Sequence, residues 1–362
     1  MTIRYPFPTA AHTYFRAINK HAQKQAFIEG TLEQPEFTYK KHWTQTLIQE
    51  RLKITKNDKT ATGRLKLVAS SLALRDNILE VENFRAANAE LFHLPSRELA
   101  EAIISRMSDN CAESDTELWS EVLRLLDIKV LNHTSIEPAD ALFQKYRDYL
   151  KHYTTLPVIG MDIIEALEAQ LEQTGLTDKG WTIKRIPGAE HAHTHHQTKT
   201  ITIGESYAPR SLSAVQRITI HEVIGHAVRG PQQKLDESEG FAIILEQLTK
   251  RSFAFRRTYR YLAVALGWGV FGKRMTFREV YEILWRMMVI HSKYTKDTAK
   301  QHAFDECYRA FRGGRPDVAG AVFLKDAVYF DANIRMWAVL DMNELSYTEF
   351  IDIIEGRRTV LS

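Results

Sequence analysis

Cysteine, glycine and proline are all scarce in this chain of 362 residues. The two cysteines, Cys111 and Cys307, lie far apart, so neither a disulfide framework nor a Cys-x-x-Cys metal site can be built from them. Such cysteine usage is typical of a reduced setting, and we expect a cytoplasmic protein. With 17 glycines and 10 prolines, few residues interrupt regular structure, which predicts a mainly helical chain.

A long apolar run and a strong excess of one charge are also missing. The longest apolar stretch, YLAVALGWGVFG (residues 261–272), is too short to span a bilayer and contains three glycines. The first residues, MTIRYPFPTAAHTYF, lack the apolar core of a signal peptide. The net charge of +3 is too small to favour nucleic acid. We therefore expect neither a membrane nor a nucleic acid as a partner.

Amphipathic patterns run along most of the chain and change character once. The first part reads as successive helices, whereas residues 180–186 and 199–205 alternate apolar and polar residues and are rich in β-branched ones, as strands are. The sequence thus predicts a mainly α, α+β protein. We expect a helical N-terminal region (1–155) and a second domain (156–362), in which a small sheet packs on the helix that follows it.

That helix contains the stretch ITIHEVIGHAVRG, residues 218–230, in which His221 and His226 stand five positions apart. Successive residues of an α-helix turn by about 100°, so side chains at i and i+5 point about 140° apart and cannot share an ion. One extra residue accommodated as a π-bulge restores a common direction. We expect such a bulge near Gly225, because glycine tolerates backbone distortion best. The neighbouring residues are apolar on most sides, and buried histidines require a partner or a metal.

The next helix can supply a third ligand. Catalytic zinc sites use three protein ligands and a water. The stretch DESEGFAIILEQL, residues 236–248, follows after a short link, so the two helices are expected to be antiparallel neighbours. Glu239 can face the histidines, and Glu237 is a rival that helical spacing does not exclude. Glu222 directly follows the first histidine, where zinc peptidase helices place their catalytic base. Together these residues predict one Zn²⁺ per chain.

HEVIGHAVRG followed by SEGFA resembles the H-E-x-x-x-H zinc peptidases. This family includes the microtubule-associated tyrosine carboxypeptidases and bacterial proteins with an E-G-L-A motif. Residues 29–42 (EGTLEQPEFTYKKH) and 311–330 (FRGGRPDVAGAVFLKDAVYF) are similar to flanking blocks of that family. Phe241 stands where leucine is usual, and no segment corresponds to a tubulin-binding insertion.

The resemblance implies a zinc-dependent metallocarboxypeptidase whose catalytic domain, zincin-like, is the second of the two predicted. It implies His221 and His226 as zinc ligands and Glu222 as catalytic base, and it favours Glu239 over Glu237 as third ligand. The expected substrate is the C-terminal tail of a peptide or protein, with tyrosine or another aromatic residue removed.

A carboxypeptidase also needs cations that hold the substrate's terminal carboxylate, and arginine can do so with two bonds. The candidates are Arg229, one turn past the second histidine, together with Arg312 and Lys325 in the second flanking block. Tyr329 can donate a hydrogen bond to a developing oxyanion. We interpret the run HAHTHH, residues 191–196, as an exposed sheet edge without a catalytic role.

Three alternatives remain open. HEVIGH is also similar to the motif of dipeptidyl-peptidase III. The same zinc site therefore suits a dipeptidyl-peptidase or an aminopeptidase as well. A non-hydrolytic regulatory module could retain the metal for structure, but a structural zinc needs no base such as Glu222. An iron oxygenase can use two histidines and one carboxylate, but such sites usually occur in β-barrels rather than in helical chains.

Overall fold

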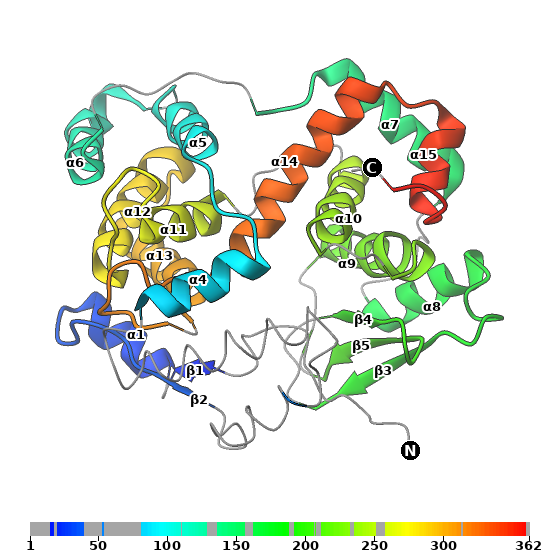
Figure 1. Ribbon diagram of the computed structural model, residues 1–362, viewed down its shortest axis with the longest axis horizontal. Coiled ribbons are helices and arrows are strands. Elements are labelled where there is room, and N and C mark those ends of the chain that lie inside the picture. The colour runs from blue at the N-terminus through cyan, green and yellow to red at the C-terminus, as the bar shows by residue number, and fades with distance from the viewer. Residues whose placement is uncertain are drawn as a thin grey trace. The chain divides into compact units, whose positions relative to one another are not determined.

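The structure is a computed structural model, and it describes residues 15–17, 20–39, 53, 81–109, 111–128, 136–155, 162–187, 192–205, 207, 211–231, 235–250, 258–312 and 314–359. These residues are mainly helical and include a small three-stranded sheet, which confirms the predicted mainly α, α+β class (Figure 1). Within these ranges, no helix has both the length and the apolar character that crossing a membrane requires.

The chain divides into two compact units, and neither is continuous in sequence. Unit 1 comprises residues 1–136 and 256–328, and unit 2 comprises residues 137–255 and 329–362. This division replaces the predicted boundary between 1–155 and 156–362. The reason is that the helices after residue 256 pack on helices of the first segment. An apolar helix face shows in the sequence, but the distant segment that covers it does not.

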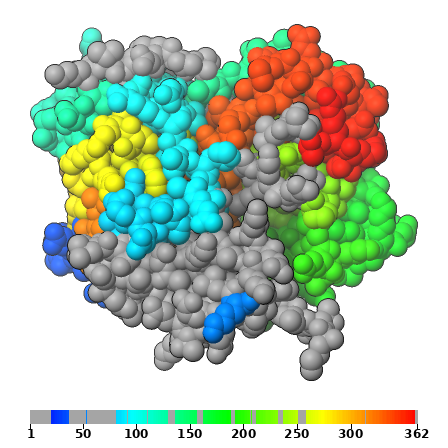
Figure 2. All heavy atoms as spheres, in the orientation of Figure 1, coloured from blue at the N-terminus to red at the C-terminus, as the bar shows by residue number. Residues whose placement is uncertain are grey.

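Three helices form the centre of unit 1: α11 (Thr258–Trp268), α12 (Phe277–Ser292) and α13 (Lys296–Phe311). A capping box fixes the start of α12, because Thr276 and Glu279 each accept a hydrogen bond from the other's backbone N–H. The remaining elements of this unit are β1 (Phe15–Ala17), α1 (Lys20–Ile28), β2 (Phe37–Tyr39), α4 (Val81–Leu91), α5 (Arg97–Asp109), η3 (Glu113–Asp115) and α6 (Thr116–Leu126). The exposed side of α4 forms part of the surface in the view of Figure 2.

Unit 2 contains the sheet and the histidine-bearing helix. Strand β5 (Thr200–Gly204) lies between β3 (Thr182–Ile186), which is parallel to it, and β4 (His193–His195), which is antiparallel. The two strands predicted from alternation are confirmed as β3 and β5. Ile201 and Ile203 of the central strand join one apolar core with residues of the helices, so the sheet packs on those helices as expected.

The helices of unit 2 surround that core. They are α7 (Asp140–Tyr153), α8 (Ile163–Gln173), α9 (Leu212–Thr219), a π-helix termed η4 (Ile220–Val228), α10 (Leu235–Lys250) and α15 (Tyr347–Ile354). Helix α14 (Lys325–Asn343) begins in residues of unit 1 and continues into unit 2. Ser211 caps α9 by accepting a hydrogen bond from the backbone N–H of Ala214, and η4 then continues α9 without a break. Gly230 follows with a positive φ of 77°, which suits the end of a helix.

Candidate metal centre

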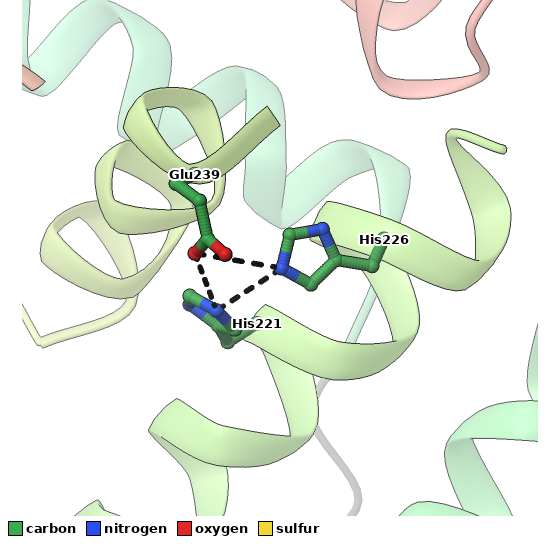
Figure 3. A group of neighbouring side chains, drawn as sticks. All are labelled: His221, His226 and Glu239. Atoms are coloured by element: carbon green, nitrogen blue, oxygen red, sulfur yellow. Dashed lines mark hydrogen bonds and ion pairs between the residues drawn. The ribbon is translucent and has the colours of Figure 1, made fainter. Parts of the chain in front are cut away.

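The helical distortion predicted around Gly225 is present, and it is longer than a single bulge. Residues Ile220–Val228 form a π-helix, in which each turn holds more residues than an α-turn. As a result, His221 and His226 lie on the same side of the helix, and their Nε2 atoms are 3.2 Å apart (Figure 3). The five-residue spacing is therefore compatible with a shared ion.

Gly225 has a different role from the one expected. Its φ is not in the left-handed region, so backbone freedom is not what its conformation requires. Instead, a Cβ atom at this position would lie 2.7 Å from the Cβ of Ala242 on α10. Glycine is needed here because the π-helix and α10 approach each other closely, and this approach brings the carboxylates of α10 to the histidines.

Glu239 of α10 completes a group of three donors. Its Oε2 lies 3.6 Å from Nε2 of His221 and 3.9 Å from Nε2 of His226. The three donor atoms all lie within 4.8 Å of one another. A tetrahedral zinc with bonds of about 2.05 Å places its ligand atoms about 3.3 Å apart. The histidine pair matches that spacing, and a small movement of the glutamate side chain would bring the third donor to it.

The rival ligand Glu237 has another partner. Its Oε1 accepts a 2.7 Å hydrogen bond from Nη2 of Arg229, and its backbone oxygen accepts a second, of 3.1 Å, from Nη1. The Arg229 side chain is 0% exposed and its guanidinium lies 4.7 Å from the ring centre of Phe241. Arg229 was predicted to hold a substrate carboxylate. In this conformation it holds the carboxylate of Glu237 instead, at the start of the helix that carries Glu239.

Glu222, the predicted base, is buried beside the ligands. Its Oε2 accepts a 2.7 Å hydrogen bond from the hydroxyl of Thr194, on strand β4. Burial raises the pKa of Glu222, while the neighbouring His221 and the hydrogen bond from Thr194 act in the opposite direction. The edge of the sheet thus fixes the direction of this carboxylate. The sequence alone did not reveal Thr194, because its partner lies 28 positions away.

The two histidines differ in their electrostatic surroundings. Burial tends to lower the pKa of His221, but the nearby carboxylates of Glu239 and Glu246 outweigh this effect and raise the pKa to about 10. Burial lowers the pKa of His226 to about 3, and the neighbouring His221 contributes to that shift. Without an ion, the site therefore keeps one proton on His221 at neutral pH. A divalent cation can take the place of that proton.

Three of the remaining predicted residues belong to the second flanking block. Arg312 is buried in unit 1, where its Nη2 lies 2.8 Å from Oδ2 of the buried Asp326. Lys325, at the start of α14, is also a buried residue of unit 1. Tyr329 is half-buried and belongs to unit 2. The metal ligands lie in unit 2, so the structure does not group Arg312 and Lys325 with them.

The run HAHTHH, residues 191–196, contains strand β4. His191 lies outside the described residues, and His193 and His195 are on β4, at the edge of the sheet. Their rings are 4.5 Å apart, and Nε2 of His195 is 3.2 Å from the hydroxyl of Thr202. Thr194, between them, is the residue of this strand that reaches the candidate base.

No protein-family model, no curated protein and no solved structure matches this chain. The resemblance to the H-E-x-x-x-H zinc peptidases therefore stays a prediction from the sequence motifs.

Proposed function

We propose that this chain is a zinc-dependent peptidase in which His221, His226 and Glu239 hold the metal. The observation that carries the proposal is the convergence of these three donors beside a buried glutamate, Glu222. A structural zinc needs no such base, whereas hydrolysis of a peptide bond does. The donor set, two imidazoles and one carboxylate, is one that catalytic zinc prefers.

Each residue of the site has a defined task in this proposal. Bound zinc would supply Lewis acidity, which lowers the pKa of a water and polarises a carbonyl group. Glu222 accepts the proton of the attacking water and donates it to the leaving amine. Thr194 holds Oε2 of Glu222, and we assign the proton transfer to the other carboxylate oxygen, Oε1.

The finer assignment is to a carboxypeptidase, and its support is the sequence resemblance. We propose that the enzyme removes a C-terminal residue, preferably tyrosine or another aromatic, from a peptide or protein tail. Within unit 2, Tyr329 is the candidate for donating a hydrogen bond to the oxyanion. Amidation of a peptide's C-terminus should then abolish cleavage, whereas N-terminal acetylation should not. The reverse result would favour the dipeptidyl-peptidase or aminopeptidase alternative.

The decisive experiment compares Glu222→Gln with the wild type. The amide has nearly the same size but cannot accept the proton, so we expect one zinc per chain in both proteins and hydrolysis only in the wild type. Metal analysis and digestion of a peptide library read by mass spectrometry measure both quantities. Glu168→Gln, an exposed substitution on α8, is the matched control and should retain both properties. Retained hydrolysis in Glu222→Gln, or a wild type without zinc, would overturn the proposal.

A further inference from the structure

Two charged side chains that are not metal ligands, Glu246 and Arg217, form a series of contacts with His221. Nδ1 of His221 lies 2.7 Å from Oε1 of Glu246, on α10. The other oxygen of Glu246, Oε2, accepts a 3.1 Å hydrogen bond from Nη1 of Arg217, on α9. The side chains of Glu246 and Arg217 are only 10% and 15% exposed. The three residues come from three consecutive helices of unit 2, and none of the tasks proposed above uses Glu246 or Arg217.

We propose that Glu246 and Arg217 are positioning residues for the metal centre, an inference that rests on the proposed zinc site. An ionised carboxylate can only accept hydrogen bonds, so the ring nitrogen that faces Glu246 carries the hydrogen. In the neutral ring, the lone pair is then on Nε2. This is the atom that lies 3.2 Å from Nε2 of His226 and 3.6 Å from the carboxylate of Glu239. Glu246 thereby fixes both the tautomer and the direction of the ligand.

Arg217 has the complementary task of holding Glu246 in place. A nearly buried carboxylate is costly unless it is paired and hydrogen-bonded. The guanidinium of Arg217 occupies Oε2 and leaves Oε1 directed at His221.

The sequence spacing explains how one helix supplies two of these groups. Glu246 stands seven positions after Glu239, two turns along α10, so both carboxylates lie on the side that faces the π-helix. The other ligand, His226, has an uncharged neighbour: its Nδ1 lies 3.0 Å from the hydroxyl of Ser238. His221 thus has a charged partner and His226 a neutral one. Replacing Glu246 should therefore weaken zinc binding more than replacing Ser238.

Zinc affinity measured by competition with a chromophoric chelator tests this assignment without reference to activity. We expect Glu246→Gln to bind zinc about 10–100-fold more weakly than the wild type, as loss of an outer carboxylate partner usually does. The loss of zinc affinity should be smaller in Ser238→Ala. The visible spectrum of bound Co²⁺ should change in Glu246→Gln, because an amide oxygen is a weaker acceptor than a carboxylate and holds the imidazole less firmly. Glu168→Gln, exposed on α8, is the control and should bind as the wild type does.

A second pair of variants keeps the test decisive if Glu246→Gln does not fold. Arg217→Met removes the partner of Glu246, and Arg217→Lys retains its charge, so zinc affinity should fall in the first and partly recover in the second. Unchanged affinity and an unchanged Co²⁺ spectrum in Glu246→Gln, or equal affinities in the wild type and Arg217→Met, would overturn the inference. A wild type that does not bind zinc would instead overturn the proposed function.

Discussion

His221 and His226 are the same residue type on the same helix, yet their pKa values are shifted in opposite directions. The carboxylates of Glu239 and Glu246 raise the pKa of His221 to about 10, whereas burial lowers that of His226 to about 3. Between these two values the two histidines together hold one proton, on His221. Zinc requires both imidazoles to be neutral, so binding must release that proton.

Zinc affinity should therefore rise with pH across the neutral range. Below the pKa of His221, about 10, each unit of lower pH makes the proton a tenfold better competitor, so affinity should fall about 100-fold from pH 8 to pH 6. His226, with a pKa of about 3, adds nothing in that range. Calorimetry in buffers of different ionisation enthalpy should show about one proton released per zinc at pH 7. Binding that does not change between pH 6 and 8 would contradict this account.

Among single residues, the sequence identified those whose spacing along the chain is typical of a metal site. The two histidines and the glutamate after the first lie within six consecutive positions, and Glu239 follows after one short link. Thr194 and Arg217 could not be found, because a hydroxyl or guanidinium becomes relevant only when the fold supplies its partner. Glu246 left a detectable sign: it repeats the position of Glu239 two turns later, on the same face of the helix.

Helix α10 packs closely against two other helices, and these two contacts determine which elements surround the site. Gly225 of the π-helix has no space for a Cβ because of Ala242, and Gly240 has none because of the backbone of Ala332 on α14. Small residues at both contacts allow α10 to pack against helices on two sides. The glycine of the E-G-F-A stretch is thus explained by packing, and so is the alanine.

Gly225→Ala should separate the π-helix from α10 and so move the histidines away from Glu239. The added Cβ would come within 2.7 Å of the Cβ of Ala242, which demands a backbone shift. We expect a loss of about 1–3 kcal/mol in the free energy of unfolding, as in other overpacked cores, together with weaker zinc binding. Chemical denaturation and chelator competition measure the two effects.

The double variant Gly225→Ala with Ala242→Gly is the control, because it transfers the methyl group from one helix to the other. It should recover part of the lost stability. If the single variant were as stable as the wild type, the close approach would not be the reason for the glycine.

Element types were easier to predict than their ends or partners. The sequences of β3 and β5 alternate apolar and polar residues and so were predictable as strands, although in the fold every residue of β5 is buried and most of β3 is exposed. Strand β4 has only three residues, too few for a pattern to show. The π-helix was predictable for a geometric reason, since two ligands five positions apart require it. Its full length of nine residues depends on packing against α10 and was not predictable.

For the whole molecule, the two units alternate along the chain. The segment 256–328 belongs with residues 1–136, and the segment 137–255 with residues 329–362. Helices α11 and α12 pack on α5, α12 also packs on α6, and α13 packs on α1. The boundary expected at residue 155 therefore falls inside unit 2, just after α7, and it also separates the two segments of unit 1.

A fragment of residues 156–362 should not fold as the intact chain does. It would retain α11, α12 and α13 without α5 and α6, and so expose apolar faces that are buried in unit 1. Exposed apolar surface of this size favours association. We expect a broad thermal transition, strong binding of a hydrophobic dye and aggregation, with the intact chain as reference. A sharp transition and wild-type zinc affinity in the fragment would show that residues 1–155 are needed neither for its folding nor for the metal site.

The π-helix also constrains how such a site can arise by mutation. Substitution changes a side chain at a fixed position and cannot alter the number of residues between His221 and His226. A helix with histidines four positions apart is separated from this one by an insertion or a deletion. Such a step rotates every later side chain of the helix by about 100° relative to the core unless the helix takes up the extra residue as a π-turn, as it does here. The two spacings therefore differ by a change in chain length together with a π-turn, and point substitutions alone do not convert one into the other.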